Sequence, residues 1–165
     1  MNLYSFAVRF AEAGLAALLY DQRNFGRSYG EPRQEADSCA QVHDMRDAIS
    51  FARHLAGIDP ERIGLWGTSY SGGHALVVGA LDRRVKCVVA QAPLISGYAT
   101  LQSWMRPEEL DAPIADCLAA RRARAAGAAP VMTPVAQLGS VEAAWVAATD
   151  PTGAFTNGLT LPAGS

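Results

Sequence analysis

The sequence of 165 residues lacks the features of several specialised classes of protein. It has no apolar run approaching the roughly 20 residues that a membrane-spanning helix requires. It also lacks an excess of positive charge, since 14 Lys and Arg residues stand against 16 Asp and Glu residues. The resulting formal charge of −2 argues against electrostatic binding to nucleic acid or to an anionic membrane surface. We therefore expect partners of neither kind.

Cysteine is also scarce, and its spacing forms no framework. Cys39, Cys87 and Cys117 are an odd number at wide spacing, with no Cys-x-x-Cys pair among them. They provide neither a disulfide framework nor a zinc site, so we expect the three cysteines to serve as small apolar residues. Cysteines without such a framework are typical of a reducing compartment, which favours the cytoplasm. The first residues have no basic segment before an apolar core and are not typical of a secretory signal. No pattern predicts a metal or an organic cofactor.

What is present is the composition of a globular domain, with 50% hydrophobic and 18% charged residues. Along the first half of the chain, apolar positions alternate between helical spacing and short unbroken runs typical of strands covered on both faces. This alternation predicts an α/β fold with three αβα layers, in which helical crossovers join the strands of a short, mainly parallel sheet. The predicted helices are 3–13, 37–55 and 71–81, and the predicted strands are 15–20, 62–66 and 85–90.

We expect three regions along the chain. Residues 1–97 would form the α/β core, and residues 98–149 would form a helical segment similar to a cap. Within this second region a helix is predicted between residues 108 and 126, and a shorter one over residues 141–148. Residues 150–165 have no periodicity and many helix breakers, so we expect a loose tail.

The sequence GTSYSGG at residues 67–73 carries the strongest chemical signal. It lies between a predicted strand and a predicted helix, where a sharp turn would expose Ser69 as in a nucleophile elbow. Such a turn needs small residues because backbone segments pass close together in it. The small residues of the motif are Gly67, Ser71, Gly72 and Gly73, and Ser71 stands where a glycine is usual. The turn would also place the backbone N–H of Tyr70 at a helix N-terminus, where it can stabilise an oxyanion.

Two other interpretations of this motif compete with the elbow. A glycine-rich helix start can serve packing alone, but the apolar strand before it and the further strand beyond it favour the elbow. Gly67 and Gly72 also have the spacing of a Walker phosphate loop. His74, however, follows Gly73 where Lys and then Ser or Thr should come, so no nucleotide site is predicted.

Three segments together resemble the α/β-hydrolase superfamily, in the branch of dienelactone-hydrolase-like and Xaa-Pro-dipeptidyl-peptidase-like serine hydrolases. They are residues 10–21 (FAEAGLAALLYD), 23–32 (RNFGRSYGEP) and 63–73 (IGLWGTSYSGG). With residues 85–93 they cover most of the first 95 residues, and beyond residue 100 the likeness is thin.

The resemblance implies hydrolysis of an ester, thioester or peptide bond through an acyl-enzyme, with a small-molecule or peptide acyl donor as substrate. Ser69 would be the nucleophile, and the backbone N–H of Tyr70 would be one of two oxyanion donors. The resemblance also implies a structural loop that braces the floor of the site through hydrogen bonds and tight turns. The residues that match this loop are Asp21, Arg23, Gly26 and Ser28.

The histidine and the acid of a catalytic triad are not found. After Ser69 the only histidine is His74, five residues further along the same predicted helix and about 140° around it, so we expect a packed or surface residue. His43 and His54 precede the nucleophile, and His43 with Asp47 is typical of a solvated contact. The acids after Ser69 follow no convincing strand and are interpreted as surface carboxylates. They are Asp82, Glu108, Glu109, Asp111, Asp116, Glu142 and Asp150.

The strand that would carry the second oxyanion donor is also missing. In the family sheet it would lie between the predicted strands 15–20 and 62–66, so its absence would leave a slot of about 9.6 Å flanked by unpaired backbone. We therefore expect a fragment from the middle of a larger hydrolase, inert alone, whose sheet a partner chain could complete. A non-catalytic binding or assembly module completed by a partner strand is the alternative. Trp104 and Met105 would be pocket residues or plain core.

Overall fold

The computed structural model describes residues 3–129 and residue 131. The chain divides into two compact units, and the first boundary between them falls between Pro93 and Leu94. The assignment of residues 98–149 to a separate cap stays a prediction. None of the helices in the described residues is long and apolar enough to cross a membrane.

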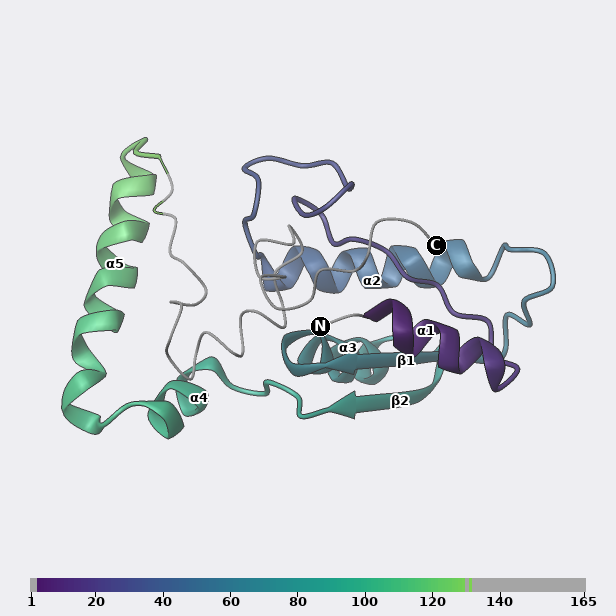
Figure 1. Ribbon diagram of the computed structural model, residues 1–165. Coiled ribbons are helices and arrows are strands. Elements are labelled where there is room, and N and C mark those ends of the chain that lie inside the picture. Colours follow the sequence, from purple (N-terminus) through teal and green to yellow (C-terminus); the bar gives the residue numbers. More distant parts are fainter. Residues whose placement is uncertain (1–2, 130, 132–165) are drawn as a thin grey trace, which may run out of the picture. The chain divides into compact units, whose positions relative to one another are not determined.

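Within the described residues, the first unit has a two-stranded parallel sheet and three helices (Figure 1). In chain order its elements are α1 (Leu3–Glu12), α2 (Ser38–Ala52), β1 (Ile63–Thr68), α3 (Ser69–Leu81) and β2 (Val85–Gln91). The strands are parallel because α3 carries the chain back across the sheet between them. After a shift near Ile63, the register runs from Gly64 opposite Cys87 to Thr68 opposite Gln91.

One face of this sheet carries the hydrophobic core. Met45 and Ile49 of α2 and Ala75 and Val78 of α3 are buried together. The partly buried residues that pack against them are Val42, Ile63, Leu65, Val85 and Val88. The helix predicted over 37–55 from helical spacing of apolar residues therefore buries Met45 and Ile49 near its centre.

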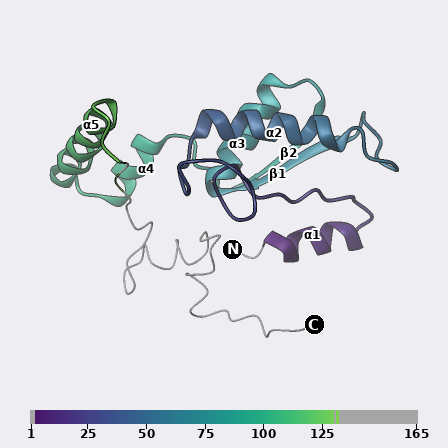
Figure 2. The ribbon, with the colours of Figure 1, turned by 90° about the horizontal axis from the view of Figure 1, so that it is seen from above.

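The opposite face of the sheet is covered by α1. Successive strand residues point to opposite faces, so Trp66 points away from the core that Leu65 faces. The Trp66 ring stacks on Phe6, with ring centroids 4.7 Å apart, and meets Phe10 edge-on at 5.7 Å. Figure 2 shows the resulting three layers, with α1 on one side of the strands and α2 and α3 on the other. The predicted αβα arrangement is confirmed for this unit.

The predicted strand at residues 15–20 is wrong for the described chain, because this segment has no strand hydrogen bonding. Leu15, Leu18 and Leu19 are 56%, 43% and 48% exposed. A strand is defined by its neighbour, and within the described residues β1 pairs only with β2. Within the described residues, the run at 15–20 pairs with neither strand of this sheet.

Several predicted boundaries shift by a few residues. The strand predicted at 62–66 extends to Thr68, and the helix predicted at 71–81 already begins at Ser69. The helix predicted at 37–55 ends at Ala52, and its N-terminus is capped by Asp37, whose Oδ1 accepts the Ala40 N–H at 2.9 Å.

The second unit is helical. It contains α4 (Gly97–Trp104), the short 3-10 helix η1 (Pro107–Glu109) and α5 (Asp111–Ala125). The helix predicted between residues 108 and 126 is confirmed as α5, which stops before Gly127, a residue with a left-handed φ of 89°. Trp104 is 58% exposed. The predicted helix at 141–148 and the predicted tail at 150–165 lie outside the described residues.

Candidate active site

The chain turns sharply where β1 gives way to α3. Ser69 is the first residue of α3 and has φ 52°, in the left-handed region that L-residues rarely adopt. Holding a residue other than glycine there costs about 1–3 kcal/mol, so the surrounding packing has to enforce it. The sequence predicts a strand-to-helix turn around Ser69, and the structure has one at this residue.

Close backbone contacts enforce the turn. A Cβ added to Gly67 would lie 2.4 Å from the Ser71 carbonyl oxygen, which no side-chain rotation could relieve. A Cβ added to Gly72 would lie 3.2 Å from the Gly67 carbonyl oxygen and from Pro93. Side chains are therefore excluded at Gly67 and disfavoured at Gly72.

Ser71 occupies its position by using its hydroxyl to close the turn. Its Oγ accepts the Thr68 N–H at 3.1 Å and donates to the Thr68 carbonyl at 2.9 Å. These bonds satisfy backbone groups at the junction of β1 and α3. They give a physical reason for a serine where the expected motif has glycine.

The side chain of Tyr70 connects this turn to α2. Its hydroxyl lies 2.5 Å from the Oγ of Ser38, the first residue of α2. Its ring meets the His74 imidazole edge-on, with centroids 4.4 Å apart. Sequence spacing gives no signal for the contact with Ser38, because the two residues lie 32 positions apart.

The structure places His74 as a packed residue of α3. It is 5% exposed, and neither ring nitrogen has a hydrogen-bond partner. Burial lowers the pKa of its imidazole and so favours the neutral form. His43 is exposed, and His54 bonds the Ser50 carbonyl through Nδ1 at 2.7 Å. Among the hydrogen bonds of the described residues, none joins Ser69 to these imidazoles.

Three of the acids that come after Ser69 in the chain pair with arginines, whereas Glu142 and Asp150 lie outside the described residues. Asp82, at the C-terminal end of α3, is 5% exposed and pairs with Arg84 at 2.6 Å and with Arg46 at 3.4 Å. The hydrogen bonds from Arg84 hold the pKa of this carboxyl well below its usual range. Asp82 is therefore a buried structural acid rather than the surface carboxylate predicted. Glu108 and Glu109 pair with Arg106, at 3.5 Å and 2.5 Å.

Three of the four predicted loop residues meet one another. The Asp21 carboxylate accepts the Arg27 N–H at 2.9 Å, and the Ser28 hydroxyl donates to the Asp21 carbonyl at 2.6 Å. Gly26 has φ 50°, and a Cβ there would lie 2.4 Å from an Asp21 carboxylate oxygen. The loop is thus a compact hydrogen-bonded turn in which Gly26 has no room for a side chain.

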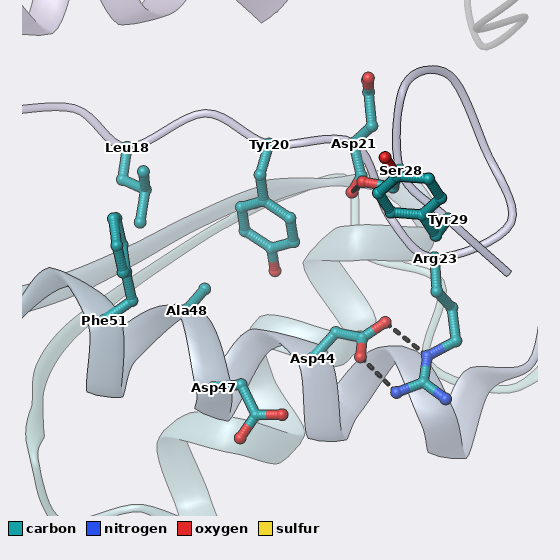
Figure 3. Close-up of a pocket in the computed structure, with 10 residues that line it drawn as sticks. All are labelled: Leu18, Tyr20, Asp21, Arg23, Ser28, Tyr29, Asp44, Asp47, Ala48 and Phe51. Carbon is teal, nitrogen blue, oxygen red and sulfur yellow. Dashed lines mark hydrogen bonds and ion pairs between the residues drawn. The ribbon is translucent and has the colours of Figure 1, made fainter.

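Two arginines make further contacts from this loop: Arg23, the fourth predicted loop residue, and Arg33, which is not predicted. Arg23 forms a two-pronged ion pair with Asp44 of α2, which Figure 3 shows as a pair of dashed contacts. The hydrogen bond raises the pKa of the Arg23 guanidinium and lowers that of the Asp44 carboxyl. Arg33 donates to the carbonyls of Ser28 at 2.5 Å and Gly26 at 2.8 Å. Sequence reasoning misses Arg33 because carbonyl acceptors leave no trace in the sequence.

An open pocket of about 410 Å³ lies between this loop and α2 (Figure 3). Burial raises the pKa of the Tyr20 phenol on its wall. The lining residues are Leu18, Tyr20, Asp21, Arg23, Ser28, Tyr29, Asp44, Asp47, Ala48 and Phe51. Neither Ser69 nor Tyr70 is among them, so the pocket is separate from the turn at Ser69.

The described residues offer no obvious site for a metal. No group of three or more histidine, cysteine or acidic side chains is placed to hold an ion in that part of the chain. Cys39, Cys87 and Cys117 are free thiols, and all three are exposed rather than packed as small apolar residues.

Comparison with known proteins agrees with this architecture. The family model of the X-Pro dipeptidyl-peptidases (S15 family) matches residues 2–160 of the chain. The quorum-quenching protein AidA of Acinetobacter baumannii is 40% identical over 136 residues, which are 82% of this chain and 44% of AidA. The thiohydrolase aneE of Aspergillus aculeatus is 43% identical over 118 residues, which are 72% of this chain and 36% of aneE.

A solved structure has the same fold. The α/β-hydrolase GrgF from Penicillium sp. sh18 matches with a TM-score of 0.68 and 32% identity, over 86% of this chain and 47% of GrgF. The chain therefore spans less than half the length of each of these three relatives.

Proposed function

The chain belongs to the X-Pro dipeptidyl-peptidase (S15) family and has the α/β-hydrolase fold, and from this premise we propose that it carries the nucleophile of a serine hydrolase. The proposal depends above all on Ser69, whose φ of 52° occurs where β1 meets α3. A strained serine between a strand and a helix is the arrangement of a nucleophile elbow. The close approach of the backbone at Gly67 supports the same interpretation.

In the proposed reaction the Oγ of Ser69 attacks the carbonyl carbon of an acyl donor. A C–O bond forms, and the carbonyl oxygen gains the electron pair of the broken π bond. The backbone N–H of Tyr70, in the first turn of α3, has no acceptor within the helix and stabilises this oxyanion. Collapse of the intermediate expels the leaving group, which takes up a proton, and water then releases the acid from Ser69.

A general base must accept the proton of Ser69 during the attack. His74 is buried five positions along α3, and His43 and His54 belong to α2 and the segment just after it. None of them suits this role. Because the matched part is less than half of each relative, the proposal places the base on another segment of the complete protein or on a partner chain.

The substrate class proposed is a thioester. The relative aneE is named a thiohydrolase, and it shares 43% of its matched residues with this chain. A thiolate is also a better leaving group than an alkoxide or an amine, so it demands less protonation by the enzyme. Oxygen esters and peptides are the competing acyl donors, and the nucleophile would serve all three.

The sheet itself also has room for a partner strand. Within the described residues one edge of β1 pairs with β2, and the other edge pairs with no strand. The exposed apolar residues Leu15, Leu18 and Leu19 add to the unburied surface of this unit. We propose that a strand of the complete protein or of a partner chain pairs with this edge of β1. The comparisons favour hydrolysis over a purely non-catalytic module.

Labelling with a fluorophosphonate probe, with imidazole added as a diffusible base, tests the nucleophile. We expect phosphonylation of the peptide that contains residue 69, and its loss in Ser69→Ala. Ser5→Ala is the matched control, because Ser5 is an exposed serine of α1 and its replacement should leave the labelling unchanged. Label that is absent from Ser69, or that survives in Ser69→Ala at the same peptide, would contradict the proposal.

A further inference from the structure

Two neighbouring strands end in the same unusual conformation. Thr68 and Gln91 are partners in the register of β1 and β2, so Ser69 and Ala92 follow them at the same end of the sheet. Ser69 has φ 52° and Ala92 has φ 43°, so both lie in the left-handed region. Neighbouring strands run about 4.8 Å apart, which makes Ala92 the lateral neighbour of the proposed nucleophile.

The residue after Ala92, Pro93, lies close to the first turns of α3. An alanine in the left-handed region costs about 1–2 kcal/mol, so local packing has to hold it there. Pro93 has a restricted φ, and its Cα and Cβ lie 3.2 Å from where a side chain of Gly72 would begin. The chain after β2 therefore lies close against the first turns of α3.

Ala92 is also exposed, whereas Gly67 and Gly72 in the adjacent turn are buried. Its methyl group is thus available to a molecule that approaches the end of the sheet. Strain at an exposed residue beside a reactive group is a sign of function, since packing alone would favour glycine at this φ.

We infer that Ala92 determines the size of the group that can reach the Ser69 hydroxyl. This inference rests on the proposed function, because it assigns a specificity role at the same site. The small methyl group leaves room for a bulky acyl donor, and a longer side chain at residue 92 would restrict approach to small ones. The residue acts by its volume alone and takes no part in bond making.

The test replaces the nucleophile by a thiol whose reactivity needs no enzymatic base. In the Ser69→Cys variant of the full chain, the introduced thiolate displaces iodide from iodoacetamide or from the bulkier N-benzyliodoacetamide and forms a thioether. Peptide mass spectrometry separates residue 69 from the three native thiols, and exposed Cys39 serves as the internal reference. The quantity measured is the ratio of the bulky to the small reagent's rate at residue 69.

Adding Ala92→Leu should lower this ratio about tenfold or more, in keeping with the discrimination that a few methylenes produce in a confined site. Ala92→Asn, which tolerates the left-handed region, should lower it as well and serves if the leucine variant misfolds. Ala92→Gly should not lower it. Ala80→Leu is the matched control, since Ala80 is exposed and about 16 Å further along α3 from residue 69.

The outcomes separate the inference from the proposed function. A reactive residue 69 whose ratio stays within about twofold in folded Ala92→Leu and Ala92→Asn would overturn the role of Ala92 alone. A residue 69 that reacts with neither reagent while Cys39 reacts would mean that the turn hides its side chain. That result would overturn the proposed nucleophile and, with it, this inference.

Discussion

Replacing Gly67 with alanine measures how tightly the turn between β1 and α3 is built. The new Cβ would lie 2.4 Å from the carbonyl oxygen of Ser71 and 2.7 Å from its carbonyl carbon. Both are backbone atoms, so the backbone must move by about 1 Å to restore ordinary contact distances. The first turn of α3, which presents Ser69, would have to move with it.

Two opposing terms set the expected magnitude. Alanine in place of glycine stabilises a protein by about 0.4–1 kcal/mol where it fits, because the unfolded chain loses freedom. Overpacking in a tight site costs about 1–3 kcal/mol. We expect Gly67→Ala to lower the free energy of unfolding by about 1–2 kcal/mol. Gly64→Ala, on the same strand, should not lower the free energy of unfolding, because its Cβ would make ordinary contacts with Cys87 atoms at 3.5 and 3.6 Å.

The assay is urea unfolding followed by circular dichroism, with both variants measured beside the parent chain. Equal free energies of unfolding for Gly67→Ala and Gly64→Ala would refute the close approach in the turn. Fluorophosphonate labelling of Ser69 supplies the second measurement. A destabilised Gly67→Ala variant that labels at the parent rate would refute the link between this backbone geometry and reactivity.

Three further predictions concern the rest of the first unit. Asp82→Asn should lower the free energy of unfolding by about 2 kcal/mol, because buried charged hydrogen bonds to Arg84 are lost. Asp116→Asn, at an exposed position of α5, should leave it unchanged in the same urea titration. The pKa of Asp82 is lower in the folded than in the unfolded chain, so its charge stabilises the fold above about pH 4, and this stabilisation is lost as the pH falls below that. The free energy of unfolding should therefore fall less steeply with acid in Asp82→Asn than in the parent chain. Trp66→Ala should raise the rate of amide hydrogen exchange throughout α1 and leave α3 protected, because the Trp66 ring contacts Phe6 and Phe10 of α1. Equal protection of α1 in the variant and the parent chain would contradict this.

Local patterns are sufficient to predict most elements of the first unit. The spacing of Met45 and Ile49 predicts α2, and both are buried. The run before Gly67 predicts β1, and the motif at 67–73 predicts the turn at Ser69. These succeed because helical periodicity and turn chemistry depend on residues a few positions apart. Pairing of residues 15–20 cannot be predicted in this way, because it depends on a neighbouring strand.

Contacts between distant residues account for the features of the candidate site that local patterns do not predict. Arg33 holds Ser28 and Gly26 through their carbonyls, which every residue possesses and no motif records. The contact between Tyr70 and Ser38 joins the turn to α2 across 32 positions. The sequence indicates a surface acid at Asp82, whereas its burial results from two arginines on different elements.

The amino-acid sequence by itself determined that a serine stands between an apolar strand and a helix, among residues small enough for the chain to fold back on itself. That depends on local sterics, which residue identity fixes. Only the tertiary structure decided that the ends of β1 and β2 lie side by side, with Ser69 and Ala92 both in the left-handed region. The register of two strands is set by packing on α3 and by backbone hydrogen bonds, and neither is encoded at any single position.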